Sequence, residues 1–172
     1  EVQIELNNVV VRGEITMLHM DEAAKLGLDW DNGLLAVSGS MIETGGTQIE
    51  NAEAGGRINL EFWRVTVHAS AGIFRMSASV NTPYPVAVDR QARQSIFIVD
   101  QDQPHFQFSG FPKRFRGNDL LRLRGSSNLY QVGPEFRDVM LRVEAGDGIS
   151  AVTQMMDLEE SPPEWVVEKS PR

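Results

Sequence analysis

The stretch DWDNG comes closest in this sequence to a metal-binding loop. Asp29 and Asp31 alternate, as oxygen ligands do in a calcium loop of the EF-hand type. Such a loop needs a third ligand two residues later and a glutamate at its twelfth position. Gly33 and Ser40 stand there instead. We therefore expect no calcium, and because Asn32 and Gly33 both tolerate positive φ, they indicate a tight turn between two apolar runs.

Other residues capable of chemistry also lack the spacing of a site. His19, His68 and His105 lie far apart in the sequence and do not show the spacing of metal ligands. The acidic stretch at 100–102 has no nearby residue to complete a coordination shell. There is no cysteine, no serine elbow and no phosphate-binding glycine loop. We expect no catalytic residue, cofactor or metal, and predict that the protein is not an enzyme.

A basic cluster holds five of the sixteen Lys and Arg residues within twelve positions: Lys113, Arg114, Arg116, Arg122 and Arg124. Cationic side chains interleaved with aromatic ones suit nucleic acid. The net charge of -8 argues against that partner. Arg122 and Arg124 alternate with leucines, as on the wet face of an amphipathic strand. We predict that the cluster pairs with acids of a neighbouring subunit and binds no nucleic acid.

The elements that must carry these residues are mainly strands. With 172 residues, 41% hydrophobic, the chain is long enough for one β-rich domain with its own core. Alternating apolar residues predict strands at 58–67, 2–11, 14–18, 34–37, 73–80, 95–99, 119–124, 139–143 and 165–167. The alternation changes phase at Phe62-Trp63, which indicates a bulge or a strand buried on both faces. One short helix is predicted over 21–27, capped by Asp21 and ended by Gly27.

We predict a single β-rich core domain over 1–158 and an acidic, proline-containing tail over 159–172. Within the core, 38–56 is rich in glycine and has little apolar periodicity, which favours one long loop. Charge is uneven: residues 1–61 carry net -8, residues 62–144 net +4 and residues 145–172 net -4. If these sectors also separate in space, the charge would favour a head-to-tail arrangement of copies; solvated faces are the alternative.

Three segments carry a family resemblance. The first joins VQIEL at 2–6 to LGLDW at 26–30, a strand followed by a short helix. The second runs from AGIFRMSAS at 71–79, through two prolines and an aspartate-led turn, to SIFIV at 95–99. The third is DVMLRVEAGDG at 138–148. Together they resemble the secretins, the ring-forming outer-membrane channels of bacterial secretion systems and type IV pili. The third segment resembles the type III branch; Arg90 departs from the family, which has asparagine there.

The resemblance implies a multi-subunit β-barrel core that is completed by copies of the chain in a ring, located in the bacterial outer membrane. It implies a gated, non-enzymatic secretion channel, with other secretion-system components as possible partners. By position, the segment at 38–56 would be the gate, with the candidate gate glycines Gly39, Gly45, Gly46, Gly55 and Gly56.

Two other hypotheses remain open. The first is a β-sandwich or jelly roll that serves as a structural or binding module of a virion or extracellular assembly. The second is an all-β carbohydrate-active enzyme or lectin.

Overall fold

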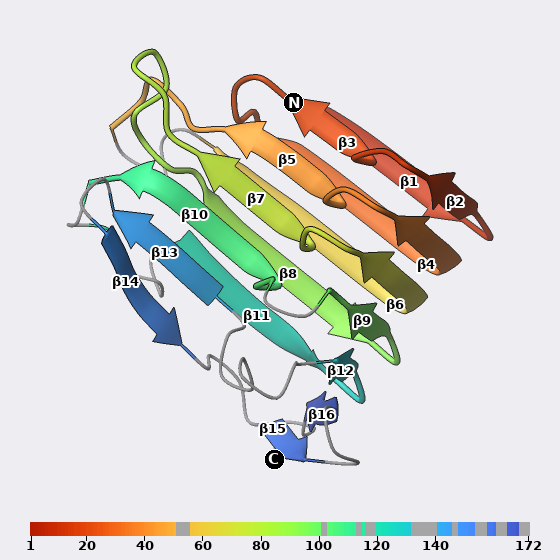
Figure 1. Ribbon diagram of the computed structural model, residues 1–172. Coiled ribbons are helices and arrows are strands. Elements are labelled where there is room, and N and C mark those ends of the chain that lie inside the picture. Colours follow the sequence, from red (N-terminus) through yellow and green to blue (C-terminus); the bar gives the residue numbers. More distant parts are fainter. Residues whose placement is uncertain are drawn as a thin grey trace.

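The computed structural model describes residues 1–50, 56–100, 103–112, 115, 120–131, 141–145, 148–153, 158–160 and 165–168. The chain winds into a β-solenoid, a stack of coils in which each coil lies against the next (Figure 1). The first coil contains β1 (Val2–Asn7), β2 (Val10–Gly13) and β3 (Leu18–Met20); the second contains β4 (Leu26–Val37) and β5 (Ile42–Gly45). The third coil contains β6 (Arg57–Ala69) and β7 (Phe74–Ser77). The fourth contains β8 (Ala87–Arg93), β9 (Ile96–Ile98) and β10 (Phe106–Phe111), and the fifth contains β11 (Leu121–Ser126), β12 (Leu129–Gln131) and β13 (Leu141–Ala145).

Parallel pairing defines this fold. Within the described residues, every pairing among β1–β13 is parallel and joins a strand to its equivalent in the next coil. The prediction of a mainly β chain is confirmed. The predicted secretin-like barrel core and the alternative β-sandwich or jelly roll are both wrong, because the sheets run along the axis of one solenoid instead of closing into a barrel or packing as a sandwich.

Stacked apolar columns form the core. Parallel register places Leu26, Ile58, Val88 and Leu121 directly above one another, and each is at most 1% exposed. Since side chains alternate between the two faces of a strand, the residues that precede and follow a column residue in its own strand point outward. Each coil therefore buries its apolar residues against the coils on either side, and only the outward residues are free to vary in character.

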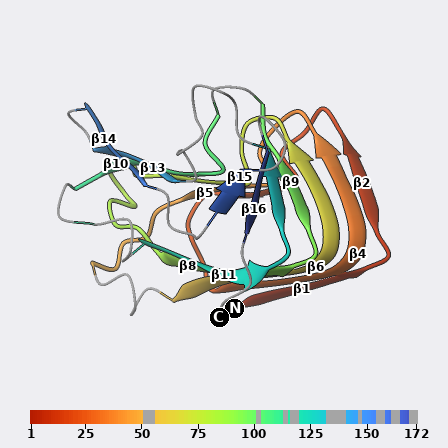
Figure 2. The same ribbon diagram turned by 90° about the horizontal axis from the view of Figure 1, so that it is seen from below.

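One corner of every coil requires left-handed backbone. At this corner, where β1 meets β2 and where β4 and β6 bend, the residues Asn8, Asn32, Arg64, Gln94 and Ser127 have φ between 52° and 58°. Figure 2 shows β4 and β6 turning this corner without a break. The predicted positive φ at Asn32 is confirmed, but the predicted tight turn between two separate strands is wrong, because β4 continues through the bend. The phase change near Trp63 has the same origin, since the bend at Arg64 replaces the expected bulge.

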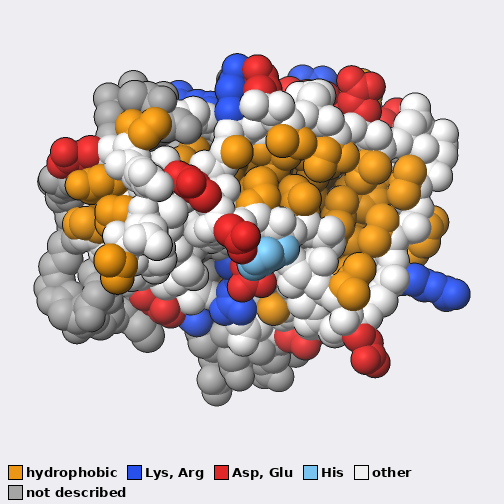
Figure 3. Space-filling model, turned by 90° about the horizontal axis from the view of Figure 1, so that it is seen from above, with side chains coloured by type: hydrophobic (Ala, Val, Ile, Leu, Met, Phe, Trp, Pro, Cys, Tyr) orange, Lys and Arg blue, Asp and Glu red, His pale blue; other side chains and the backbone are white. Residues whose placement is uncertain are grey.

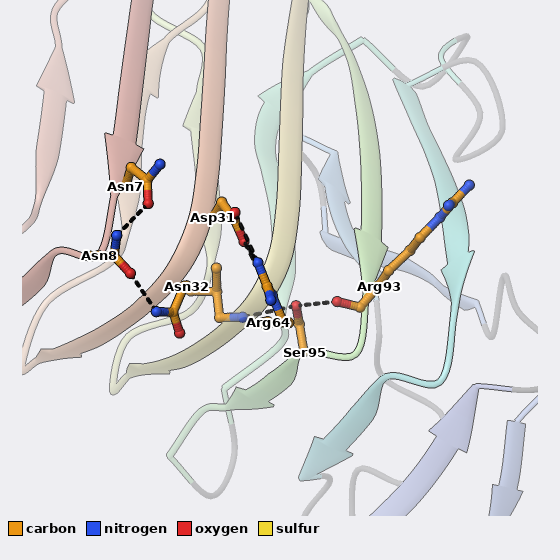
Figure 4. A network of polar contacts seen from close by, with 8 residues as sticks. Asn7, Asn8, Asp31, Asn32, Arg64, Arg93 and Ser95 are labelled. Carbon is orange, nitrogen blue, oxygen red and sulfur yellow. Dashed lines mark hydrogen bonds and ion pairs between the residues drawn. The ribbon is translucent and has the colours of Figure 1, made fainter.

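Polar contacts follow this corner from coil to coil (Figure 4). The Asn32 side chain donates a hydrogen bond to Asn8 of the preceding coil. Arg64 Nη2 donates to both carboxylate oxygens of Asp31, at 2.8 and 3.0 Å. Ser95 Oγ accepts from the backbone N–H of Val65 at 3.2 Å. These side chains satisfy one another at the position where the bend interrupts the regular ladder of backbone hydrogen bonds.

Gly33 lies one residue beyond the corner and makes room for the largest side chain of the core. A Cβ at Gly33 would lie 1.9 Å from Trp30 Nε1 and 2.8 Å from the carbonyl oxygen of Val9. Trp30 is only 2% exposed. Gly33 does not have a positive φ, so backbone conformation does not require glycine here. The glycine is needed because any side chain would collide with Trp30.

The helix predicted over 21–27 is absent, because backbone bonds to adjacent coils take its place. The backbone N–H of Ala23 donates to the carbonyl of Gly46 in the next coil at 2.9 Å. The carbonyl of Lys25 accepts from the N–H of Val2 in the preceding coil, also at 2.9 Å. Ala23 is 6% exposed, and β4 begins at Leu26. Hydrogen bonds to the adjacent coils therefore override the helix propensity of these residues.

Most of the segment 38–56, which we expected to be one long loop, is part of the second coil. It contains β5, which pairs with β3 on one side and with β7 on the other. Met41 and Ile42 are fully buried and Thr44 is 3% exposed. The four-residue strand is too short to show a period in the sequence, and only its pairing identifies it.

Antiparallel strands cover much of the far end of the solenoid. β14 (Gly148–Thr153) pairs antiparallel with β13, and β16 (Trp165–Glu168) pairs antiparallel with β12. β15 (Leu158–Glu160) extends the sheet from β16. β16 comes from the predicted tail at 159–172. Two of the three strands of the last coil thus have a partner on their outer edge.

A polar group lies inside the last two coils. Arg90 is 1% exposed, although it occupies a column that holds leucine in the neighbouring coils. Its Nη2 donates to the Tyr130 hydroxyl at 2.6 Å, and its guanidinium carbon lies 5.5 Å from the centre of the Phe97 ring. His105 is fully buried, and its Nε2 lies 2.9 Å from the carbonyl oxygen of Gln131. Burial lowers the pKa of His105 to about 4, and the nearby Arg90 charge acts in the same direction.

The corner geometry predicts a stabilising substitution, Gln94→Asn. Gln94 is exposed and has φ 52°, a conformation that asparagine adopts more readily than glutamine. We expect the free energy of unfolding to rise by roughly 0.5 kcal/mol, measured by chemical denaturation. Gln91→Asn, in the regular part of β8, is the control and should lower stability, since asparagine is disfavoured in strands. Equal effects at the two positions would contradict this explanation of the corner.

The buried histidine predicts a loss of stability in mild acid. Below pH 6.5 the unfolded chain binds a proton at His105, whereas the folded chain remains unprotonated there until about pH 4. The free energy of unfolding should therefore fall as the pH falls through this window, by roughly 3 kcal/mol in total. Denaturation of His105→Gln should show a smaller dependence on pH. His68→Gln, at a half-exposed histidine, should keep the wild-type dependence; the opposite ranking would contradict the prediction.

Candidate functional site

The residues that were weighed as catalytic or metal-binding do not come together. His19 lies 3.4 Å from Asp21, His68 lies 3.5 Å from Asp100, and His105 is in the core. Among the described residues there is no group of three or more His, Cys, Asp or Glu side chains that could hold a metal ion. In the same part of the chain, no helix has the length and apolar character to cross a membrane.

The candidate gate glycines lie where coils come close together. A Cβ on Gly39, Gly45 or Gly46 would lie between 2.1 and 2.7 Å from a backbone oxygen of an adjacent coil. Gly56 has φ +100°, and Gly55 lies outside the described residues. The three close approaches give these glycines a packing role in the stack, and their predicted role in gating stays a prediction.

The predicted inter-subunit charges lie largely outside the described part of the chain, which does not include Lys113, Arg114 or Arg116. Arg122 is exposed on β11. Arg124 donates two hydrogen bonds to the Asp89 carboxylate of the preceding coil, at 2.7 and 3.2 Å. These bonds raise the pKa of the Arg124 guanidinium. Arg124 therefore pairs within the chain.

The first candidate surface is the open end of the solenoid, which we define by the apolar side chains of the first coil. These side chains pack against the core but are only partly buried: Ile4, Leu6, Val9, Val11, Met17, Leu18 and Met20. Their register partners one coil further in are buried: Leu28, Trp30, Leu35 and Ile42 are at most 2% exposed. Figure 3 looks down on this end of the molecule and shows a broad apolar patch with charged side chains around it. The interior of the stack is uncovered here.

Backbone groups at the open end are also unpaired on one side. Within the described residues, β1 and β2 pair only with β4, and β3 pairs only with β5. The N–H groups of Val2 and Asn8 donate to the second coil, and the carbonyls of Val9 and Gly13 accept from it. Backbone groups of successive residues in a strand point in alternate directions. The N–H and C=O groups of Val10 and Arg12 on β2 therefore face the open edge.

The second candidate surface is a trough on the outer face of β1, β4, β6 and β8. It has a volume of ≈ 520 Å³. Parallel register places Glu5, Asp29 and Glu61 side by side on neighbouring strands, and we call these three residues the acidic ladder. Trp63 lines the trough next to the ladder and is 50% exposed. Arg93 lines the end of the trough on the fourth coil.

The solenoid converts order along the chain into position along the axis. Successive coils are stacked in sequence order, so the described residues of the acidic sector, 1–50 and 56–61, lie in the coils toward the open end. On the outer face, Asp29 and Asp31 lie on the second coil and Glu5 on the first, while Arg122 and Arg124 lie on the fifth. Before the corner, the third and fourth coils each carry one acid and one arginine at the outward positions of β6 and β8, so the acidic and basic sectors separate at the two ends of this face.

Sequence reasoning found neither surface. The ladder residues are 24 and 32 positions apart, and only the register brings them together. The alternation pattern places Trp63 in a strand and assigns it no function. Its position at the change of phase is the one feature of the sequence that could have indicated an exposed tryptophan. Comparison of the chain with known protein families, with curated proteins and with solved structures finds no match. The resemblance to secretins therefore stays a prediction.

Proposed function

We propose that this chain is a non-enzymatic structural module that assembles with a second copy of itself through the open end of the solenoid. The observation that carries the proposal is the first coil, which combines partly buried core residues with strand edges that have no partner among the described residues. Such edges recruit further strands unless they are blocked. A second copy would cover the apolar residues and provide backbone partners at the same time.

The two ends of the solenoid differ, and this difference selects the arrangement. β14 and β16 already occupy the outer edges of β13 and β12. A head-to-tail stack would need those edges, whereas a head-to-head pair uses only the open ends. An interface between two open ends is isologous and closes at two copies. The proposal therefore favours a dimer over the ring that the secretin resemblance implies.

The pairing geometry is one that this chain already uses. A two-fold axis makes equivalent edges antiparallel, and β14 and β16 show that both sheets accept an antiparallel strand at an edge. With β1 centred on Ile4, the amide of Gln3 would lie opposite Glu5 of the partner subunit. An amide facing a carboxylate can donate a hydrogen bond to it, so this register avoids opposing like charges.

The channel function depended on the predicted barrel core, which the solenoid replaces. It stays a prediction, and the fold provides no support for it. The alternative, a β-sandwich that serves as a structural or binding module of a virion or extracellular assembly, loses its fold in the same way. Its structural role needs no sandwich and is close to the proposal made here.

The proposal predicts a dimer of twice the 19.2 kDa chain mass in sedimentation at micromolar concentration. Ile4→Lys adds a charge to the apolar patch, and Gln3→Pro removes an N–H that faces the open edge of β1, so each should raise the dimer dissociation constant at least tenfold. Val80→Lys, at a residue that is 98% exposed and distant in sequence from the first coil, is the control and should leave the dimer unchanged.

Thermal unfolding of each variant at low concentration will show whether the monomer still folds. Gln3→Pro provides the more direct test, because Gln3 is exposed and its N–H is outside the ladder with β4, to which the N–H of Val2 donates. A wild-type chain that stays monomeric up to millimolar concentration would overturn the proposal. So would rings or filaments, because neither can be built from two open ends alone.

A further inference from the structure

We infer that the trough on the outer face of β1, β4, β6 and β8 binds an extended, basic segment of polypeptide. Four carboxylates line the trough, those of the acidic ladder and that of Asp31, against the single guanidinium of Arg93. Asp31 is neutralised by Arg64 at 2.8 Å. Within the described part of the chain, none of the three ladder carboxylates has an ion pair; Asp29 accepts a hydrogen bond from the neutral amide of Gln3 at 2.9 Å. The trough therefore has an uncompensated negative charge.

The acidic ladder opposes folding. Its three carboxylates stand on adjacent strands, which lie about 4.8 Å apart, and like charges directly opposite one another destabilise a sheet. Elsewhere on this face the chain does pair its charges, as Arg124 and Arg57 do with Asp89 at 2.7 and 3.6 Å. Local conflicts of this kind concentrate at binding sites, where a ligand resolves them.

Trp63 adds a surface that suits basic side chains. Arg64 and Arg93 place their guanidinium carbons 5.9 Å from the centre of the Trp63 ring, so this ring already accepts guanidinium groups in the chain itself. Half of the Trp63 side chain is still exposed. A basic ligand would therefore find carboxylates for its charges and an aromatic face for its aliphatic stems.

The dimensions of the trough favour a polypeptide over a single ion. Its lining residues span four strands, from Glu5 on β1 to Gln91 on β8, which is about 14 Å. Basic side chains at alternate positions of an extended peptide are about 6.7 Å apart, so two or three of them cover this distance. The described residues contain no cluster for a metal ion. The negative ladder repels nucleic acid. This inference does not depend on dimer formation.

The test uses fluorescence anisotropy of a labelled hexa-arginine peptide with the complete 172-residue chain. We expect saturable binding that weakens as salt increases. The double variant Asp29→Asn with Glu61→Gln should weaken binding at least tenfold while keeping side-chain shape. Its control is Glu14→Gln with Glu22→Gln, which removes the same net charge at exposed acids that do not line the trough. The control should change the affinity less than twofold. Trp63→Ala should weaken binding at least fivefold.

Three results of these titrations would overturn the inference. The first is no binding of the peptide at low salt. The second is equal weakening by the two double variants, which would show that the peptide is attracted by net charge alone. The third is spermine that binds as tightly as the peptide, which would identify a small polyamine as the ligand class instead. Thermal unfolding controls for folding, since the ladder variant should unfold at a slightly higher temperature once the like charges are removed. Repeating the titration with Leu18→Lys, which adds a charge to the apolar patch on β3 and away from the trough, separates this result from the fate of the dimer proposal.

Discussion

Stacking of each coil on the next in parallel register is the interaction on which this structure depends. A residue in a column must fit the residues above and below it in size and polarity, because side chains of the same face meet at the strand spacing. Leu26, Ile58, Val88 and Leu121 meet this condition with apolar side chains. The five corner residues show the same matching in the backbone, because all of them adopt the left-handed conformation at the same place in their coils. A coil that lacked the bend would place its next strand outside the sheet.

Departures from this rule have two different consequences. Arg90 interrupts an apolar column, but Tyr130 and Phe97 surround its guanidinium, so the charge is buried among groups that bind it. His105 is buried as the neutral imidazole. The acidic ladder is different, because its charges are repeated on adjacent strands and make no ion pair within the described part of the chain. The Arg90 guanidinium and His105 Nε2 are bonded inside the fold, although His105 Nδ1 has no hydrogen-bond partner among the described residues. The acidic ladder lies on the outer face and is therefore available to a ligand.

A solenoid has two ends, and the chain treats them differently. Toward the end of the chain, β14 and β16 add antiparallel strands to the last coil. At the other end, the apolar interior of the first coil is only partly buried, and within the described residues its strands have partners on one side only. Growth of the stack is therefore possible from one end and obstructed at the other. The outer face also changes along the axis, from acidic on the first two coils to basic on the fifth.

The sequence alone determined that the chain is mainly β, that a strand runs through 58–67, and that Asn32 can adopt positive φ, since alternation and backbone preference are local properties. It also gave the uneven charge. The strand expected over 2–11 is divided by the corner at Asn8 into β1 and β2. The sequence did not reveal the solenoid, because the coils repeat at unequal intervals of 24, 32, 30 and 33 residues, from Val2 to Leu26, Ile58, Val88 and Leu121. Local preference favoured a helix at 21–27 and a loop at 38–56, and pairing with adjacent coils overrode both.

The open end, the acidic ladder and the burial of His105 arise from contacts between residues distant in the chain. Only the tertiary structure could decide these features, because the register that creates them is a property of the whole stack.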